Sequence, residues 1–146
     1  MSMAEQPLKL VLDTSIYIPF INKGIAHPAI ESHLAHPLLY LSAVVVEELY
    51  AGAFDVHSIK LLDKLYAAFS DLGRVVTPNA ADWQHTGKVV AQLGRKYGFE
   101  NIFLAKITND ILIALSARRI GAAILTNNAK DFVKIQEYVD FKLYVK

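Results

Sequence analysis

Short apolar runs alternate with longer stretches of helical periodicity along this chain, and this alternation limits the possible folds more than any other feature. The helical stretches carry apolar residues three or four positions apart, whereas the short runs have the length of buried strands. The predicted strands span residues 8–12, 38–41, 74–76, 122–126 and 142–145. Strands that alternate with helices favour a parallel sheet flanked by helices, so the pattern predicts the α/β class.

The predicted helices follow from the same periodicity and from residues that start or stop helices. Thr14 or Ser15 can cap the first helix, Ser42 can cap the third, and Gly121 is typical of the end of the sixth. No linker or repeat divides the chain, so we expect residues 1–146 to form a single domain, with a flexible N-terminus over residues 1–7. In chain order the predicted helices span about 14–24, 28–35, 42–52, 59–69, 83–97, 108–121 and 129–137.

Composition and charge narrow the class of protein. The chain is 53% hydrophobic, which predicts a folded protein and leaves open whether the excess fills the core or covers a partner interface. A net charge of +1 gives no global field that attracts nucleic acid, so any such binding needs a local basic surface.

The absence of cysteine excludes disulfides and thiolate metal sites. No apolar run approaches the roughly 18 residues of a bilayer span, and no signal peptide is recognised, so we expect a cytoplasmic protein without a membrane segment.

Four acidic residues occupy positions that an α/β fold can bring together. Asp13 follows the first predicted strand, Asp131 follows the fourth, Glu48 lies in the third helix and Asp110 opens the sixth. Ligand sites in open α/β sheets lie beyond the carboxyl ends of the strands, and clustered carboxylates repel one another unless a divalent cation lies among them. Oxygen ligands favour Mg²⁺ or Mn²⁺ over zinc. The pattern predicts a site for one or two such ions, with the dipole of the sixth helix keeping Asp110 ionised in its first turn.

Each acidic residue also has a simpler interpretation as a helix cap, a turn residue or a solvated side chain, and only the ordered set favours a functional site. Periodicity does not separate Glu47 from Glu48, since both have apolar neighbours. Other chemistries find little support. His33 and His36 lack further zinc ligands, and Trp83 and the tyrosines are assigned to the core or to an interface rather than to base stacking.

Four motifs together make the sequence similar to a known family. In chain order they are Val11-Leu12-Asp13-Thr14-Ser15, Glu48-Leu49-Tyr50-Ala51-Gly52, Asn109-Asp110-Ile111-Leu112-Ile113-Ala114, and Leu125-Thr126-Asn127-Asn128 with Asp131-Phe132. The set resembles the PIN-domain nucleases and, among them, most resembles the VapC toxins of toxin–antitoxin pairs. The resemblance implies a PIN fold, with a parallel sheet of four or five strands flanked by helices. It also implies a Mg²⁺- or Mn²⁺-dependent ribonuclease that hydrolyses RNA phosphodiester bonds.

Carried over by position, the resemblance assigns Asp13, Glu48 and Asp110 to the three core carboxylates of the catalytic metal site. It favours Glu48 over Glu47 because Glu48 stands four residues before Gly52, as the family pattern requires. The roles of these residues are therefore what the resemblance implies, and the periodicity of the sequence alone leaves the choice between the two glutamates open.

The fourth position of the metal site stays open between two residues. Some family members carry an acidic residue where this chain has Asn128, and others have an asparagine there with an aspartate further on. Asp131 is our candidate for the fourth catalytic and metal-binding carboxylate. Thr14, Thr126 and Asn128 are the candidates for supporting polar contacts around the site.

The resemblance also implies an RNA substrate, a protein antitoxin that blocks the acidic pocket, and a homodimer. Basic residues near the predicted mouth of the site can bind the RNA backbone, although single lysines and arginines more often only solvate a helix face. The candidates are Arg118, Arg119, Lys130 and Lys134, with Lys88, Arg95, Lys96 and Lys106 as further ones.

Two rival functions stay open. The first is a PIN-like domain that binds RNA or a protein partner without cleaving RNA. The second is a phosphatase with Asp13 as nucleophile, a class that usually needs another aspartate two residues on, where this chain has Ser15.

Overall fold

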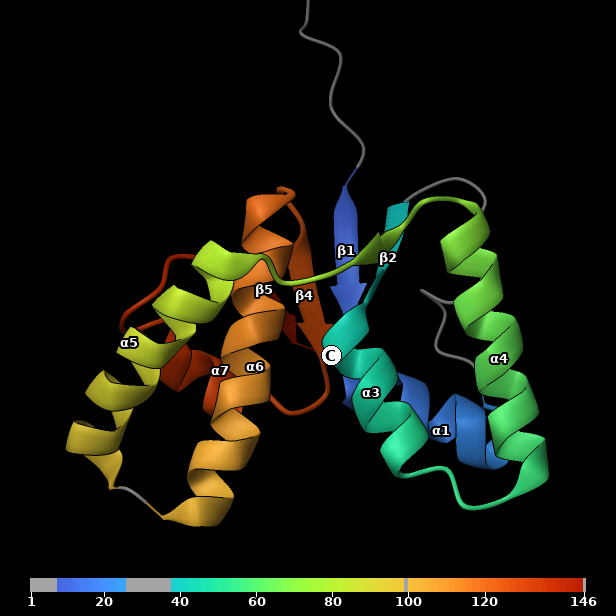
Figure 1. The fold of residues 1–146 in the computed structure, drawn as a ribbon, viewed down its shortest axis with the longest axis horizontal. Coiled ribbons are helices and arrows are strands. Elements are labelled where there is room, and N and C mark those ends of the chain that lie inside the picture. Colours follow the sequence, from blue (N-terminus) through green and yellow to red (C-terminus); the bar gives the residue numbers. More distant parts are fainter. Residues whose placement is uncertain (1–7, 26–37, 99, 146) are drawn as a thin grey trace, which may run out of the picture.

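A parallel sheet forms the centre of the part of the chain that the computed structural model describes, residues 8–25, 38–98 and 100–145. In this part, five strands pair in the order β3-β2-β1-β4-β5 (Figure 1). All four strand pairs are parallel, which confirms the predicted α/β class. The strands are β1 (Lys9–Leu12), β2 (Leu38–Ser42), β3 (Val75–Val76), β4 (Ala123–Thr126) and β5 (Leu143–Val145).

Helices flank this sheet in two groups (Figure 1). The first group, α1, α3 and α4, lies on the side of β2, and the second group, α5, α6 and α7, lies on the side of β4. Among the helices described, none combines the length and apolar character that a membrane span requires. The helix predicted at 28–35 and the N-terminus at 1–7 lie outside the described residues. The bounds are α1 (Thr14–Lys23), α3 (Ala43–Ala51), α4 (Val56–Asp71), α5 (Ala80–Tyr97), α6 (Asn101–Arg119) and α7 (Lys130–Ile135).

The central strand β1 sets the geometry of the carboxyl edge of the sheet. Leu12, at the end of β1, is 0% exposed and pairs in register with Leu125 of β4. The pairing continues one residue further, because the backbone N–H of Asp13 donates to the carbonyl of Leu125 at 2.9 Å. Asp13 and Thr126 are therefore neighbours at the edge where both strands end.

The start of α1 differs from the prediction. Asp13 is the N-cap residue, rather than Thr14 or Ser15, and its side chain makes no capping hydrogen bond. Thr14 and Ser15 lie in the first turn, where their hydroxyls donate to carboxylates instead. The cap predicted for α3 is confirmed, because Ser42 Oγ accepts a hydrogen bond from the N–H of Val44 at 3.2 Å.

The predicted start of α6 is wrong, and the correction changes the setting of Asp110. The helix begins at Asn101 rather than near Thr108. Its apolar face extends back toward the N-terminus through the buried Ile107 and the partly buried Phe103, which packs against the core. Asp110 therefore lies in the middle of a long helix and not in its first turn.

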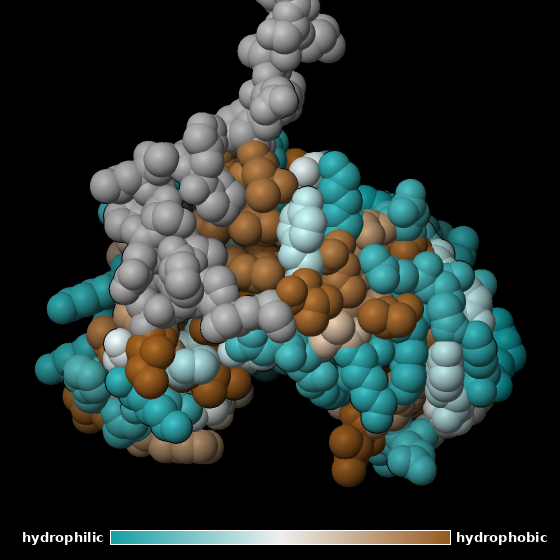
Figure 2. Space-filling model, turned by 180° about the vertical axis from the view of Figure 1, so that it is seen from behind, coloured by the Kyte–Doolittle hydropathy of each residue, from teal (hydrophilic) through white to brown (hydrophobic). Residues whose placement is uncertain are grey.

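Hydrophobic residues also reach the surface. In the view from behind, they gather near the middle of the face, and hydrophilic residues cover most of its lower right part (Figure 2). Several large apolar side chains on and beside α1 and α4 are exposed, and they leave apolar area for a partner. These residues are Ile18, Ile25, Val56, Ile59, Tyr66 and Leu72.

Helix α6 offers a matched test of the core. Ile113 is 0% exposed, whereas Ile102 on the same helix is 85% exposed. We expect Ile113→Ala to lower the free energy of unfolding by about 2–5 kcal/mol, because it leaves a cavity. Ile102→Ala should change it by less than about 0.5 kcal/mol. Urea unfolding followed by circular dichroism measures both, and equal losses would contradict the burial of this face of α6.

Candidate metal centre at the carboxyl edge of the sheet

Asp13 is held in place by two hydroxyl groups. The residue is only 7% exposed, although its side chain is polar. Thr126 Oγ1 donates to Asp13 Oδ2 at 2.8 Å, and Ser15 Oγ donates to the same oxygen at 2.9 Å. Since both donors converge on Oδ2, the other carboxylate oxygen takes no part in these bonds. The two hydroxyls fix the carboxylate at the end of β1 and leave one oxygen for another partner.

Glu48 faces Asp13 from α3. Thr14 Oγ1 donates to Glu48 Oε1 at 2.8 Å, and Asn109 Nδ2 of α6 donates to Oε2 at 3.5 Å. Burial raises the pKa of Glu48, these two hydrogen bonds oppose the rise, and the charges of Asp13 and Glu47 add to it. Glu48 therefore faces α1 and α6 at the site, whereas the neighbouring Glu47 is exposed and lines a separate pocket.

Asp110 is the carboxylate of this group with a strongly raised pKa. It is 7% exposed, and burial together with the charges of Asp13, Glu48 and Asp131 raises its pKa to about 8, against a smaller lowering by Lys106. The prediction that a helix dipole keeps Asp110 ionised is wrong, because the effect of the dipole falls off after the first turn. Asp110 is instead a buried acid whose neutral form the surroundings favour.

Asp131 completes the acidic group from α7. It lies in the first turn of that helix, and Lys106 Nζ of α6 is 3.3 Å from its Oδ2. Its charge contributes to the raised pKa of Asp110, so Asp131 faces the same region. Asn128 is exposed, and its backbone N–H donates to Thr126 Oγ1 at 2.9 Å. Asn128 thus supports the loop through its backbone.

The four carboxylates influence one another, yet they do not converge on a point. Among the described residues, no group of three or more His, Asp or Glu side chains is arranged to hold one metal ion. The reason is visible in their partners: Asp13 is bonded to Thr126, Glu48 to Thr14 and Asp131 to Lys106. Ligation of one ion by three of them would need side-chain rotations. The donor set of carboxylate, amide and hydroxyl oxygens suits Mg²⁺ or Mn²⁺.

The basic residues predicted to bind RNA have different surroundings. Arg119 is engaged within the protein, because Nε donates to Asp82 at 3.1 Å and Nη2 donates to the carbonyl of Thr77 at 2.7 Å. Lys134 Nζ lies 4.7 Å from the centre of the Tyr97 ring. Arg118 and Lys130 are exposed.

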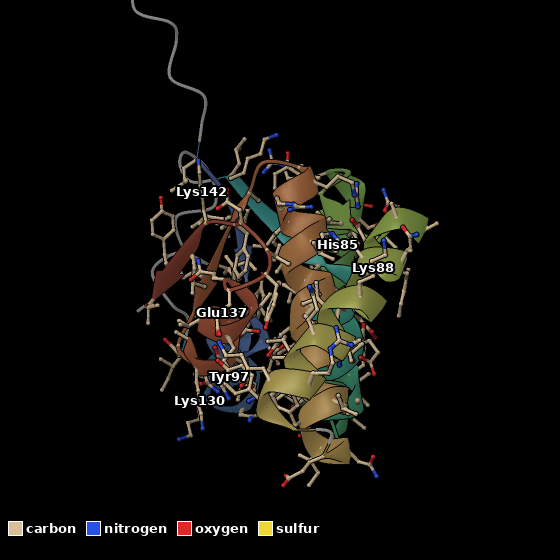
Figure 3. All side chains as sticks on the ribbon, turned by 90° about the vertical axis from the view of Figure 1, so that its left-hand side faces the viewer. His85, Lys88, Tyr97, Lys130, Glu137 and Lys142 are labelled. Atoms are coloured by element: carbon tan, nitrogen blue, oxygen red, sulfur yellow. The ribbon has the colours of Figure 1, made fainter. Side chains whose placement is uncertain are left out.

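Figure 3 shows the surface of α5 and α7 on which some of these side chains lie. Tyr97 and Glu137 lie near each other, and the Tyr97 hydroxyl donates to Glu137 at 2.7 Å (Figure 3). Lys130 lies at the edge of the same face (Figure 3). On this face the carboxylate of Glu137 is therefore engaged within the protein, by the Tyr97 hydroxyl and by Lys96.

Among the described basic residues, Lys106 is the one whose ion pair reaches the four carboxylates, at Asp131. The sequence alone did not distinguish it from the other lysines. A usable signal was present, since Lys106 and Asp110 are four residues apart and lie on one face of a helix. That signal depends on extending α6 back to Asn101. Ser15 and Asn109 were also not assigned to the site as hydrogen-bond donors, although both lie inside the motifs.

The raised pKa of Asp110 predicts how stability depends on pH without divalent ions. The folded state holds the Asp110 proton more tightly than the unfolded chain, where the pKa is near its ordinary value of 3.8. The free energy of unfolding should therefore fall as pH rises from 3.8 to about 8, by on the order of a few kcal/mol. Asp110→Asn removes this titration, so we expect it to raise the melting temperature more at about pH 8 than at about pH 5.

Thermal unfolding in EDTA at the two pH values measures this difference. Asp71→Asn is the control, because Asp71 is an exposed carboxylate at the end of α4. If Asp110→Asn and Asp71→Asn shift the melting temperature by the same amount at both pH values, the buried, raised-pKa state of Asp110 is excluded.

Known proteins share this fold. The family model described as PIN domain matches residues 10–138, most of the chain. VapBC2 from Rickettsia felis, bound to a promoter DNA fragment, is 22% identical over 95% of this chain and 99% of that chain, with a TM-score of 0.68. DNA-bound VapBC from Salmonella typhimurium is 23% identical over 94% and 98%, with a TM-score of 0.65. VapBC-1 from nontypeable Haemophilus influenzae is 24% identical over 94% and 98%, with a TM-score of 0.60.

These comparisons agree with the four sequence motifs. Among curated protein sequences, none matches the chain. The similar structures come from VapBC systems, one of them described as a toxin–antitoxin family member from Mycobacterium tuberculosis, and the chain shares their fold. The matched range contains all four acidic residues at the edge of the sheet. The chain belongs to the PIN domain family.

Proposed function

We propose that the chain is a metal-dependent endoribonuclease that hydrolyses RNA phosphodiester bonds. The observation that carries the proposal is the gathering of Asp13, Glu48, Asp110 and Asp131 at the carboxyl edge of the sheet, where burial and the neighbouring charges raise the pKa of Asp110 to about 8. Burying like charges together costs the fold free energy, so the group is not explained by stability. A divalent cation among the carboxylates would offset their repulsion.

The four carboxylates would hold one or two Mg²⁺ or Mn²⁺ ions, with Asp13, Glu48 and Asp110 as the core and Asp131 as the fourth ligand. A bound ion of this kind lowers the pKa of a coordinated water and stabilises negative charge on a phosphate. The protein contributes orientation, because Thr126 positions Asp13 and Thr14 positions Glu48 through hydrogen bonds of 2.8 Å. These hydrogen bonds orient the carboxylates around the site, and side-chain rotations would bring three of them onto one ion.

The RNA would approach between α6 and α7. Lys106 lies beside Asp131 on this side, and the exposed Lys130 precedes Asp131 in the first turn of α7. Two lysines can contact phosphates on either side of the cleaved bond. An exposed loop of RNA, with its bases unpaired, is the shape such a site can reach.

We also propose that the chain acts as the toxin of a toxin–antitoxin pair, in the cytoplasm, as a homodimer with a protein antitoxin. The similar structures are VapBC complexes. The exposed apolar side chains of α1 and α4 offer a surface that a protein partner can cover. The hydrophobic area in the middle of the face in Figure 2 supports the same proposal.

The two rival functions predict different results. A non-catalytic PIN domain would bind RNA or a protein partner and leave the RNA intact. A phosphatase would use Asp13 as nucleophile, through the carboxylate oxygen that Thr126 and Ser15 do not engage. Trapping of an aspartyl-phosphate would favour the phosphatase over the nuclease.

Substitution of Asp13 tests the nuclease. In Mg²⁺ or Mn²⁺, wild-type protein should cleave a structured RNA with unpaired loops, and EDTA should stop cleavage. Asp13→Asn should lower the cleavage rate at least about 100-fold, beyond the roughly 10–100-fold cost of disturbing an outer-shell partner. Asp71→Asn should retain wild-type activity. Cleavage by Asp13→Asn at the wild-type rate, or activity that persists in EDTA, would contradict the proposal.

A second pair of variants decides the fourth ligand. We expect Asp131→Asn to weaken Mn²⁺ binding by more than about 10–100-fold, the cost of disturbing an outer-shell partner, because it removes a carboxylate ligand from the site. Asn128→Ala should change Mn²⁺ affinity by less than about threefold, since its structural contact is made by the backbone. Isothermal titration calorimetry measures both. The opposite order of effects would assign the fourth position to Asn128.

A further inference from the structure

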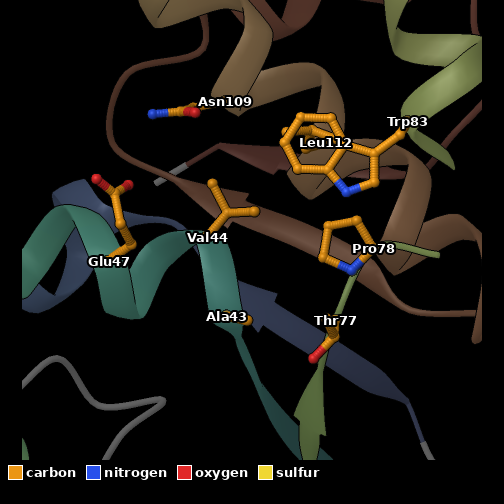
Figure 4. A pocket seen from close by; sticks show the side chains of 8 residues that line it. All are labelled: Ala43, Val44, Glu47, Thr77, Pro78, Trp83, Asn109 and Leu112. Atoms are coloured by element: carbon orange, nitrogen blue, oxygen red, sulfur yellow. The ribbon is translucent and has the colours of Figure 1, made fainter. Parts of the chain in front are cut away.

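A pocket opens beside the acidic site, between α3, the segment before α5, and the helices α5 and α6 (Figure 4). Its volume is about 430 Å³, within the range of about 300–1,000 Å³ typical of small-molecule sites. In Figure 4, Glu47 and Asn109 lie on one side, and Trp83 and Pro78 lie on the other. The lining residues are Ala43, Val44, Glu47, Thr77, Pro78, Trp83, Asn109 and Leu112.

The apolar side of the pocket presents an aromatic plane to solvent. Trp83 is 57% exposed, so it is not a core residue, and its predicted role at an interface stays a prediction. Helix α5 turns its buried residues Val89 and Leu93 toward the core, and Trp83 stands on another face of the helix. Pro78 and Leu112 flank the indole in the pocket (Figure 4). Together they form an apolar wall against which a flat ring can stack.

The polar side of the pocket connects it to the acidic site. Asn109 lines the pocket, and its Nδ2 donates to Glu48 Oε2 at 3.5 Å. Glu47 and Glu48 are consecutive on α3, and the charge of Glu47 contributes to the raised pKa of Glu48. The pocket and the acidic site therefore share Asn109, so a group in the pocket lies on the other side of that amide from Glu48.

Charge decides which part of an RNA chain fits. Glu47 at the pocket and Glu48 beside it repel phosphate, and none of the described residues that line the pocket is basic. A neutral, planar group with N–H donors satisfies both sides, since its face can stack on Trp83 and its donors can reach the carboxylate of Glu47. A nucleobase is such a group. Guanine offers two adjacent N–H donors on one edge, which matches the two oxygens of a carboxylate.

We propose that this pocket is a nucleobase subsite, in which an unpaired base next to the cleaved phosphate stacks on Trp83 and donates hydrogen bonds to Glu47, with guanine preferred. The inference rests on the proposed ribonuclease function for its role in cleavage. Binding of a free nucleoside does not depend on that function, because a nucleoside has no phosphodiester bond and carries no phosphate for a metal ion to bind. The two ideas can therefore fail separately.

Fluorescence gives a direct test of binding. Trp83 is the only tryptophan of the chain, so its emission reports on this pocket alone. Guanosine should quench the emission at lower concentration than adenosine, cytidine or uridine. Glu47→Gln should weaken guanosine binding between about 5- and 150-fold, the range for loss of one two-bond base contact, and should reduce the preference for guanosine. Phe54→Ala, which removes an aromatic side chain that is 92% exposed outside the pocket, should leave quenching unchanged.

Cleavage kinetics give the second test. Trp83→Ala should raise KM for RNA between about 5- and 150-fold, the range for loss of one base–aromatic stack, with a smaller change in kcat. Trp83→Phe should retain part of the affinity, because it keeps an aromatic face. Phe54→Ala should leave KM unchanged. Cleavage sites of the wild type should carry a guanine at one fixed position beside the cut, and Glu47→Gln should relax that preference.

Three outcomes would overturn the proposal. The first is RNA cleavage with no quenching by any nucleoside and with unchanged KM in Trp83→Ala. The second is quenching that is equal for all nucleosides and unaffected by Glu47→Gln. The third is a Trp83 emission that changes with protein concentration alone, together with conversion of a dimer to a monomer by Trp83→Ala, which would assign the pocket to a second copy of the chain. Guanosine quenching without any RNA cleavage would contradict the proposed ribonuclease function and would still support base binding in the pocket.

Discussion

Mutual repulsion among buried carboxylates is the constraint around which the rest of this structure is arranged. Parallel pairing of β1 with β4 forces Asp13 and Thr126 to the same edge, where α3, α6 and α7 each add an acidic side chain. The fold moderates the repulsion in several ways. Thr126 and Thr14 donate hydrogen bonds to carboxylates, and Lys106 pairs with Asp131. Burial, together with the repulsion that remains, raises the pKa of Asp110 to about 8.

Helix α3 serves two neighbouring surfaces with two consecutive residues. Successive side chains of an α-helix point about 100° apart, so Glu48 can face the carboxylates while Glu47 lines the adjoining pocket. Asn109 joins the two surfaces, because it contacts Glu48 and also lines the pocket. The proposed metal site and the proposed base subsite would thus share helix α3 and the side chain of Asn109. Substitution of one glutamate would remove a side chain from one of the two surfaces only.

Sequence patterns located the strands well and the ends of the helices less well. Strands buried on both faces are short continuous apolar runs, so the predicted range 122–126 falls close to β4 at Ala123–Thr126. The start of α6 was missed because residues 101–107 carry no strong capping signal, and Glu100 makes no side-chain cap. That single error misplaced Asp110 in a first turn. It also hid the relation between Asp110 and Lys106, which exists only if both residues share one helix.

By itself, the sequence determined the α/β class, the alternation of strands and helices along the chain, and which acidic residues stand at the ends of strands and in helices. Apolar periodicity and motif spacing are local properties of the chain. Tertiary structure decided what those residues experience. The separate directions of Glu47 and Glu48, the neutral form favoured at Asp110 and the exposure of Trp83 all depend on which helix faces pack against the sheet. Burial and the distance between charges are set by contacts across the fold, and no local pattern encodes them.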